Sequence, residues 1–168
     1  MFTIREMTDI DRNHLRYAYR FALSHSDDEH TKNGAVLVLE DGNIAYGANR
    51  FPRGVSTAGR LDRPTKYDYI IHAEQDAIVR CALRGVCSYG ATLYAPWVPC
   101  LKCAQLIIQA GIVHVIGHHE MHARGNARWD DEIARAVAML QEADVLYERV
   151  AGVVGDCTNL FDGQEWAP

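Results

Sequence analysis

The chain has 168 residues, of which 48% are hydrophobic and 23% charged, and its formal net charge is −5. These values place it among ordinary globular proteins and predict a single domain over residues 1–168 with a substantial core. A nucleic-acid-binding protein usually has a basic surface because phosphate contacts supply most of its affinity, and this acidic chain has no run of Lys or Arg. We therefore expect a small, freely diffusing substrate and no nucleic acid as partner.

The sequence also argues against export and against a membrane protein. No apolar run approaches the ~18 residues that suggest a membrane span. The first residues include Arg5, Glu6, Asp9 and Asp11 and lack a signal-peptide pattern. The cysteines number five, an odd count that does not suggest a disulfide framework. We expect a soluble, cytoplasmic protein.

The first predicted element is a helix over residues 8–25, where apolar residues recur at helical spacing. Thr8 and Asp9 are both suitable N-caps for it. Because its apolar residues form one stripe, we expect this helix to pack against the rest of the domain.

A β-hairpin is predicted next. Residues 34–40 and 43–49 are apolar stretches on either side of Asp41-Gly42, a strong signal for a tight hairpin turn. Residues 50–69 are rich in Gly, Pro, Arg and Ser and have no periodicity, so they form a long loop. Long ordered loops in compact domains are often functional.

From residue 72 onward, helical patterns alternate with short buried strands. A helix between the last two strands is a crossover connection, which makes those strands parallel. The predicted fold is thus a hairpin followed by βαβαβ, a three-layer α/β/α domain with a five-stranded mixed sheet. The tail from about residue 152 is expected to be loosely held. Helices are expected over residues 72–83, 100–110 and 129–142, and strands over residues 91–95, 112–116 and 145–150.

Two short motifs carry the chemistry, His72-Ala73-Glu74 and the segment PCLKC over residues 99–103. One imidazole and two thiolates are a common zinc ligand set, and three protein ligands leave a fourth position for water, as in catalytic sites. Cys100 and Cys103 are three residues apart, so both sulfurs lie on one face of the first helical turn. A helix start also favours the thiolate form.

Glu74 is the predicted proton-transfer group. On an ideal helix it is turned roughly 200° from His72, so we do not expect it to complete the same metal tetrahedron. A C-x-x-C pair alone could be a redox pair or half of a zinc ribbon. H-x-E together with P-C-x-x-C is the signature of zinc nucleobase deaminases. We expect one catalytic Zn²⁺ per chain, bound by His72, Cys100 and Cys103, and no second metal.

Residues 34–150 resemble the cytidine deaminase superfamily and, within it, the deoxycytidylate (dCMP) deaminase family. The densest stretches are TKYDYIIHAEQDAI, residues 65–78, and PCLKCAQLIIQAGI, residues 99–112. The resemblance implies zinc-dependent hydrolysis of dCMP to dUMP and ammonia, a homo-oligomer such as a dimer or hexamer, and regulation by dCTP and dTTP. Arg50 replaces the usual glycine and the loop after it is shorter than in many members, which weakens the transfer of that regulation.

The resemblance also assigns substrate contacts. Asn49 corresponds to the family's sugar-contacting asparagine, the Ala73 amide would bind the base O2, and the Val98 carbonyl would hold the exocyclic amine. A turn asparagine is the alternative reading of Asn49.

Other substrate contacts are suggested by position in the chain. Arg53 could meet a phosphate or be a solvated loop residue. Loops after parallel strands line the ligand crevice in α/β folds, so a basic cluster after residue 116 could also meet the phosphate. Trp97 and Tyr94 could stack on the base or belong to the core. The basic cluster comprises His118, His119, His122, Arg124 and Arg128.

Three alternative functions remain open. The chain could be a zinc deaminase of another cytosine nucleotide, nucleoside or base, for example 5-methyl-dCMP or deoxycytidine. It could edit tRNA or single-stranded DNA, which its acidity disfavours. It could also be a non-catalytic zinc module, in which Glu74 would have no evident purpose.

Overall fold

The computed structural model describes residues 3–125 and 129–168. Its main sheet has six strands in the order β1-β6-β5-β4-β2-β3, and β7 and β8 form a separate two-stranded sheet. The strands are β1 (Thr3–Glu6), β2 (Gly34–Val38), β3 (Ile44–Ala48), β4 (Thr92–Tyr94), β5 (His114–His118), β6 (Leu146–Ala151), β7 (Asn159–Phe161) and β8 (Gln164–Trp166). The helices are α1 (Asp9–His25), the 3₁₀ helix η1 (Thr65–Asp68), α2 (Ala73–Leu83), α3 (Leu101–Gln109), α4 (His119–His122) and α5 (Asp130–Glu142).

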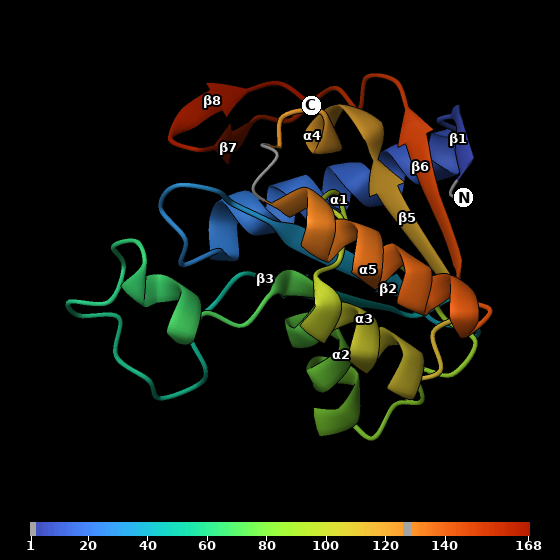
Figure 1. Cartoon of the computed structure of the whole chain (residues 1–168), viewed down its shortest axis with the longest axis horizontal. Coiled ribbons are helices and arrows are strands. Elements are labelled where there is room, and N and C mark those ends of the chain that lie inside the picture. Colours follow the sequence, from blue (N-terminus) through green and yellow to red (C-terminus); the bar gives the residue numbers. More distant parts are fainter. Residues whose placement is uncertain (1–2, 126–128) are drawn as a thin grey trace.

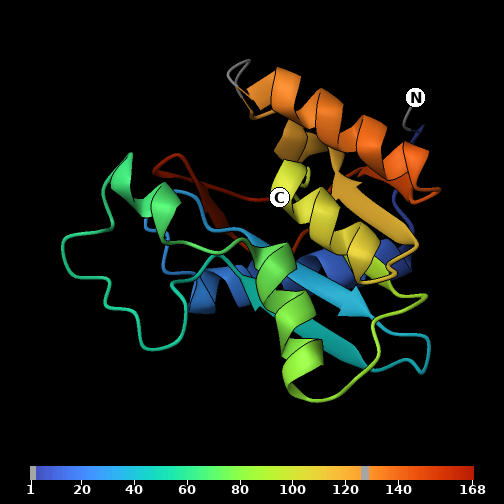
Figure 2. The same ribbon diagram turned by 60° about the horizontal axis from the view of Figure 1, so that its bottom comes forward.

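The sheet is mixed and lies between two helical layers (Figures 1 and 2). β2 pairs antiparallel with β3 and with β4, whereas β4, β5, β6 and β1 are mutually parallel. One hydrophobic core joins the sheet to α2, α3 and α5. A second core joins its other face to α1 and to the C-terminal segment. The predicted three-layer arrangement is confirmed, and so is the parallel pairing of the last two predicted strands.

The first helix begins where its sequence predicts. Thr8 is the N-cap of α1, and its hydroxyl accepts a hydrogen bond from the Asp11 backbone N–H at 3.2 Å. The Asp11 carboxylate accepts the Thr8 N–H in return at 2.9 Å, which completes a capping box. Leu15, Tyr19 and Ala22 lie on the buried face, one or two turns apart. This stripe anchors α1 on the sheet.

The prediction of five strands is wrong by one, because β1 adds a sixth at the sheet edge. β1 pairs parallel with β6, Thr3 opposite Glu148 and Glu6 opposite Ala151. Its four residues are largely exposed and polar. A strand this short and polar has no hydrophobic alternation, so its own sequence could not indicate it.

The C-terminal tail also differs from the prediction, since it is not loosely held. β7 and β8 form an antiparallel hairpin with Asn159 opposite Trp166. Trp166 is buried and packs edge-on against Tyr19 of α1, with ring centroids 5.8 Å apart. Gly and Asp residues favour turns, and here they form the hairpin turn rather than a disordered end.

A charge network ties β1 to the rest of the sheet. Arg5 donates to both carboxylate oxygens of Asp11, at 2.6 and 3.1 Å, and to Glu148 at 3.2 Å. Glu148 also lies 3.0 Å from Nε2 of His114. The Tyr94 hydroxyl donates to Asp11 at 3.3 Å. Asp11 therefore joins α1, β1 and β4.

Asp11→Asn is expected to destabilise the fold above pH 4. Burial opposes ionisation of Asp11, but hydrogen bonds from Arg5 and Thr8 lower its pKa from 3.8 to about 2. A depressed carboxyl pKa contributes stability that is present above the unfolded pKa and is lost as pH falls through the folded one. We expect urea titrations at pH 7 to show a loss of about 2 kcal/mol, shrinking toward pH 2. Asp9→Asn, on a 98% exposed side chain, should change the free energy of unfolding little. Equal losses in both variants would contradict the stabilising role of the Asp11 carboxylate.

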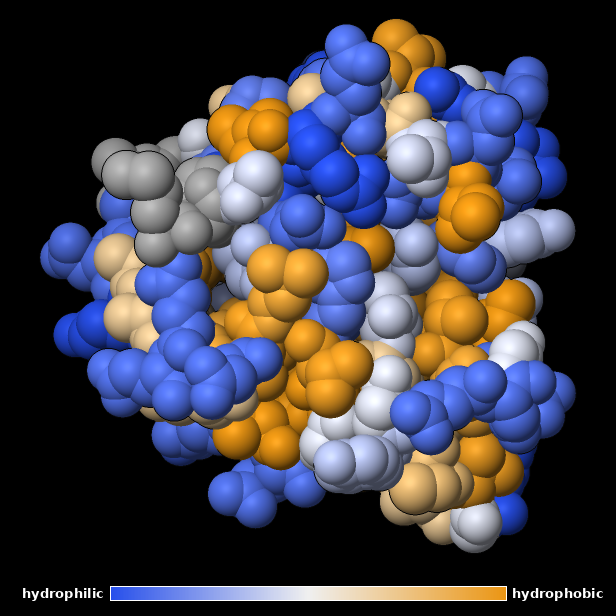
Figure 3. Space-filling view, turned by 90° about the vertical axis from the view of Figure 1, so that its right-hand side faces the viewer, coloured by the Kyte–Doolittle hydropathy of each residue, from blue (hydrophilic) through white to orange (hydrophobic). Residues whose placement is uncertain are grey.

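The surface is of mixed character. Figure 3 shows hydrophobic residues in patches separated by polar ones on the face to the right of Figure 1. Such a mixture is usual for globular domains. Within residues 3–125 and 129–168, no helix combines the length and the apolar composition that crossing a membrane requires.

Candidate metal centre

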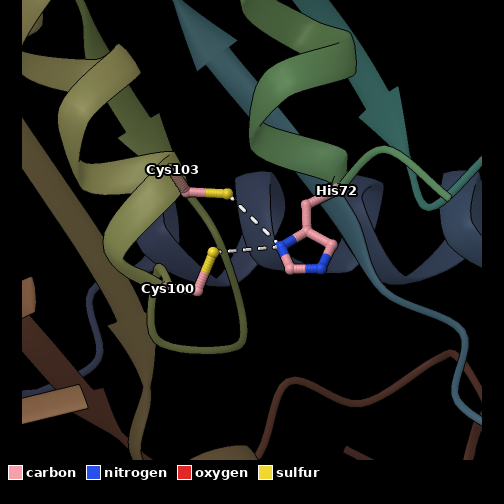
Figure 4. Close-up of side chains that lie close together, drawn as sticks. All are labelled: His72, Cys100 and Cys103. Atoms are coloured by element: carbon pink, nitrogen blue, oxygen red, sulfur yellow. Dashed lines mark hydrogen bonds between the residues drawn. The ribbon is translucent and has the colours of Figure 1, made fainter. Parts of the chain in front are cut away.

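His72, Cys100 and Cys103 converge at the starts of α2 and α3 (Figure 4). Nδ1 of His72 lies 3.4 Å from Sγ of Cys100 and 3.4 Å from Sγ of Cys103. The three atoms lie within 4.8 Å of one another. His72 is the N-cap of α2 and Cys100 the N-cap of α3, so each helix begins at the cluster. α3 begins one residue later than predicted.

The geometry of this donor set fits zinc. Zinc–sulfur bonds of about 2.3 Å and zinc–nitrogen bonds of about 2.0 Å, at a tetrahedral angle, separate nitrogen and sulfur by roughly 3.6 Å. The two observed nitrogen–sulfur separations of 3.4 Å are close to that value. One imidazole and two thiols are also a chemical set that zinc prefers. The residues present can therefore hold a tetrahedral zinc ion with three protein ligands.

The ionisation of the cluster is consistent with a ligand role. Hydrogen bonds from Cys103 and His72 outweigh burial and lower the pKa of Cys100 to about 4. The hydrogen bond to Cys100, together with burial, raises the pKa of Cys103. Burial opposes the charged form of His72, but its hydrogen bond to Cys100 raises its pKa to about 9. One thiolate is thus stabilised by two neighbouring groups, and thiolates are the form that metals bind.

Glu74 lies beside the cluster with its carboxylate inside the protein. Its side chain is 2% exposed, and Oε2 has no hydrogen-bond partner among the described residues. Burial raises the pKa of Glu74 to about 7. A carboxyl group with a pKa near neutrality can both accept and donate a proton. An unsatisfied buried oxygen also needs a polar partner, which a ligand or water could supply.

The start of α2 is fixed by the end of β3. Asn49 accepts the Ala73 N–H through Oδ1 at 3.0 Å, and Gln75 accepts the His72 N–H at 3.0 Å. Asp76 accepts the Ala48 N–H at 3.1 Å. A Cβ on Gly47 would lie 1.9 Å from the Ala73 carbonyl oxygen, so only glycine allows this approach. These contacts hold His72 in place.

The loop before His72 is ordered by a buried ion pair. Arg50 and Ile71 form an antiparallel bridge with hydrogen bonds of 3.1 and 2.8 Å, which closes the base of the loop. Within it, Nζ of Lys66 lies 2.6 and 2.7 Å from the two carboxylate oxygens of Asp28. Lys66 is 1% exposed. Breaking such a buried pair from one side usually costs about 3–5 kcal/mol, so it is a strong anchor for the loop.

Sequence reasoning did not identify the Lys66–Asp28 pair. The two residues are 38 positions apart in segments that look like polar loops. Single charged residues in such segments are normally solvated, and nothing in their spacing indicates burial. Only the fold brings them together.

The predicted substrate contacts differ in how close they lie to the ligand candidates in the chain and in how far they are buried. Ala73 follows His72 in the chain, and Val98, which is buried, stands two residues before Cys100. Asn49 follows β3 and reaches the start of α2 through its hydrogen bond with Ala73. The Ala73 N–H, which the family resemblance assigns to the base O2, donates to Asn49 in this structure. Arg53 is exposed in the loop and has no ion pair among the described residues. Trp97 is half-buried and packs against both cores.

His118 differs from its predicted position. It is 1% exposed, and Nδ1 lies 2.7 Å from the Tyr19 hydroxyl while Nε2 lies 3.0 Å from the Gly152 carbonyl oxygen. Both ring nitrogens thus have protein partners, and the side chain has no access to a phosphate from solvent. His118 is the last residue of β5, so it is still part of the sheet and not of the loop after it. Arg128 lies outside the described residues.

The fold and the cluster together define a cytidine deaminase-like protein: an α/β/α sandwich whose two helix starts bring together one imidazole and two thiols. The sequence agrees with this assignment. Residues 8–119 match the family described as "Cytidine and deoxycytidylate deaminase zinc-binding region", and the chain belongs to that family.

Individual relatives share this assignment. The chain is 34% identical over 123 residues to an "Uncharacterized deaminase in luxG 3'region" of Aliivibrio fischeri, covering 73% of this chain and 81% of that one. It is 38% identical over 101 residues to deoxycytidylate deaminase of Homo sapiens, covering 54% of each. It therefore spans about half the length of that relative. The dCMP deaminase of cyanophage S-TIM5, solved in complex with dCMP and dUMP, superposes with a TM-score of 0.66 at 26% identity, over 86% of this chain and 100% of that one.

Proposed function

We propose that this protein catalyses the hydrolytic deamination of dCMP to dUMP and ammonia. The observation that carries the proposal is the convergence of His72, Cys100 and Cys103 beside Glu74. Oε2 of Glu74 is buried and has no hydrogen-bond partner in the part of the chain that the structure describes. Membership of the deaminase family supports the reaction class. The structural similarity to a deaminase solved with dCMP and dUMP supports a pyrimidine nucleotide as substrate.

The metal would be held by His72, Cys100 and Cys103. When bound, zinc supplies Lewis acidity that brings the pKa of water down to about 7. His72 is the N-cap of α2 and Cys100 the N-cap of α3, which supports a ligand set carried by two helix starts.

Glu74 performs the proton transfers. It accepts a proton from the attacking water and passes it to the ring N3, which makes C4 more electrophilic. The water oxygen then bonds to C4. Glu74 takes the remaining proton from that oxygen and delivers it to the amino group, the C4–N bond breaks, and ammonia leaves. A pKa of about 7 for Glu74 suits both directions of transfer.

Binding residues would orient the nucleotide. The Asn49 side chain uses its oxygen on the start of α2, which leaves its amide N–H groups for the sugar. The Val98 carbonyl would accept from the exocyclic amine. Arg53, exposed in the loop, is the residue we assign to the phosphate.

A substrate panel tests the proposal. Ammonia release should be measured with dCMP, deoxycytidine, cytosine and 5-methyl-dCMP on the zinc-loaded protein. We expect kcat/KM for dCMP to exceed that for deoxycytidine by about 100-fold, because a charged phosphate contact is worth about 1.5–3 kcal/mol. Equal kcat/KM values for dCMP and deoxycytidine would contradict a nucleotide as the preferred substrate. Absence of ammonia from all four would reject deamination of these pyrimidines.

A further inference from the structure

The C-terminal hairpin touches segments from both sides of the metal centre. Phe161 of β7 stacks on Trp97, with ring centroids 5.5 Å apart and planes 27° apart. The next residue, Asp162, lies 2.6 Å from the guanidinium of Arg63 in the long loop. Trp97 stands three residues before Cys100, and the long loop leads directly to His72. Figures 1 and 2 both show the hairpin on the side of the molecule from which that loop projects.

The hairpin is also fixed to the connection between α1 and β2. Lys32 donates its backbone N–H to the Leu160 carbonyl at 3.0 Å, and Gly163 donates to the His30 carbonyl at 2.8 Å. The Asp162 N–H donates to the Thr31 hydroxyl at 3.0 Å. Hydrogen bonds to three successive residues of this connection, two of them between backbone groups and one to the Thr31 hydroxyl, hold the hairpin in one register. The Phe161 ring therefore has a fixed place.

Trp97 also packs against the segment after α4. A Cβ on Gly125 would lie 2.6 Å from Cη2 of the indole, so the chain after α4 passes directly against the ring. The His122 ring lies 6.3 Å from it, tilted by 48°. Contacts with several neighbours restrict the orientation of an aromatic side chain. Phe161 therefore adds to the packing around a side chain that stands three residues before the ligand candidate Cys100.

We propose that the hairpin of residues 159–166 is a strap that forms the outer wall of the substrate site. Phe161, acting through Trp97, sets the size of that site to a single nucleotide. The strap joins the Cys100 side to the His72 side, so a ligand that extends beyond one nucleotide meets it. This inference rests on the proposed deaminase function. Its segment lies outside the residues 8–119 that match the family.

The first test is kinetic and uses Phe161→Ala in the full, zinc-loaded chain. Loss of the ring frees Trp97, so KM for dCMP should rise about tenfold while kcat stays within about threefold. Phe161→Tyr keeps the stacked ring and should restore the wild-type KM. Glu142→Ala, on an exposed residue of α5 outside the hairpin, is the control and should leave both constants unchanged. If KM for dCMP in Phe161→Ala equals that of the wild type, the strap proposal is wrong.

The second test needs no turnover. Calorimetric titration of dUMP into Glu74→Gln should give a dissociation constant about tenfold lower than for the same chain with Phe161→Ala added. If Phe161→Ala does not fold, Phe161→Leu keeps most of the apolar volume without the stacked ring and takes its place. Unfolding midpoints of the variants show whether a change in affinity exceeds a general loss of stability. Equal dUMP affinities in the two backgrounds would contradict the proposal.

The third test addresses size selection. A short single-stranded oligodeoxynucleotide containing one cytosine should be a poor substrate of the wild type, with kcat/KM far below that for dCMP. The ratio of the two kcat/KM values should fall at least tenfold in Phe161→Ala. If the wild type is active and Phe161→Ala has the same KM and the same preference for dCMP, the strap proposal is wrong and the proposed function stands. A wild type that releases no ammonia from any of the four panel substrates would reject the proposed function, and the strap inference with it.

Discussion

Replacing Glu74 by glutamine is expected to lower kcat by about 10⁴-fold while zinc content stays near one ion per chain. Glutamine keeps the size and the hydrogen-bonding shape of the side chain but cannot accept the proton of water at neutral pH. General acid–base catalysis contributes typically 10²–10⁴-fold, and Glu74 is assigned both the N3 and the leaving-group transfers, so the upper end applies. The buried position of the carboxylate leaves bulk water unable to replace it.

Elemental analysis and ammonia release on the same preparations test this prediction. Glu142→Gln, which neutralises an exposed carboxylate on α5, is the control and should keep full activity. Loss of zinc together with activity in Glu74→Gln would show that Glu74 is a ligand. Substantial residual turnover with zinc retained would place the proton transfer on another group.

The sequence predicts the centre of this fold well because local signals agree there. Asp41-Gly42 predicts a hairpin, and Gly42 has the positive φ of 81° that its turn requires. The apolar periodicities on the two central helices predict α2 and α3, and the predicted ligands lie at their starts. In such regions propensity, hydrophobic pattern and motif spacing all favour one structure, so reading each of them separately leads to the same fold.

The parts that were not predicted depend on contacts between distant segments. β1 is a strand because β6 offers it a partner, and the C-terminal hairpin is ordered because the segment before β2 both donates hydrogen bonds to it and accepts them from it. His118 was assigned to a surface loop because a histidine run looks polar. Its burial depends on Tyr19 and Gly152, which lie 99 and 34 residues away in the chain. Tertiary pairing of this kind leaves no local periodicity to read.

Cys100→Ser is expected to lose zinc and stability together. A serine hydroxyl is a poor zinc ligand at neutral pH, and the two remaining protein ligands bind the ion far more weakly. A metal that binds the folded chain stabilises it by RT ln(1 + [L]/Kd), which is about 4 kcal/mol at a thousandfold excess over Kd. We therefore expect unfolding free energy to fall by about 4 kcal/mol and zinc content to approach zero.

A chelator separates loss of metal from damage to the fold. If the destabilisation of Cys100→Ser comes from the missing ion, a chelator should lower the wild-type unfolding midpoint to that of the variant and leave the variant unchanged. Cys87→Ser, on an exposed thiol, should respond as the wild type does. A variant that keeps near one zinc per chain would remove Cys100 from the ligand set. If the chelator leaves the unfolding midpoint of the wild type unchanged, the metal does not contribute to the stability of α2 and α3.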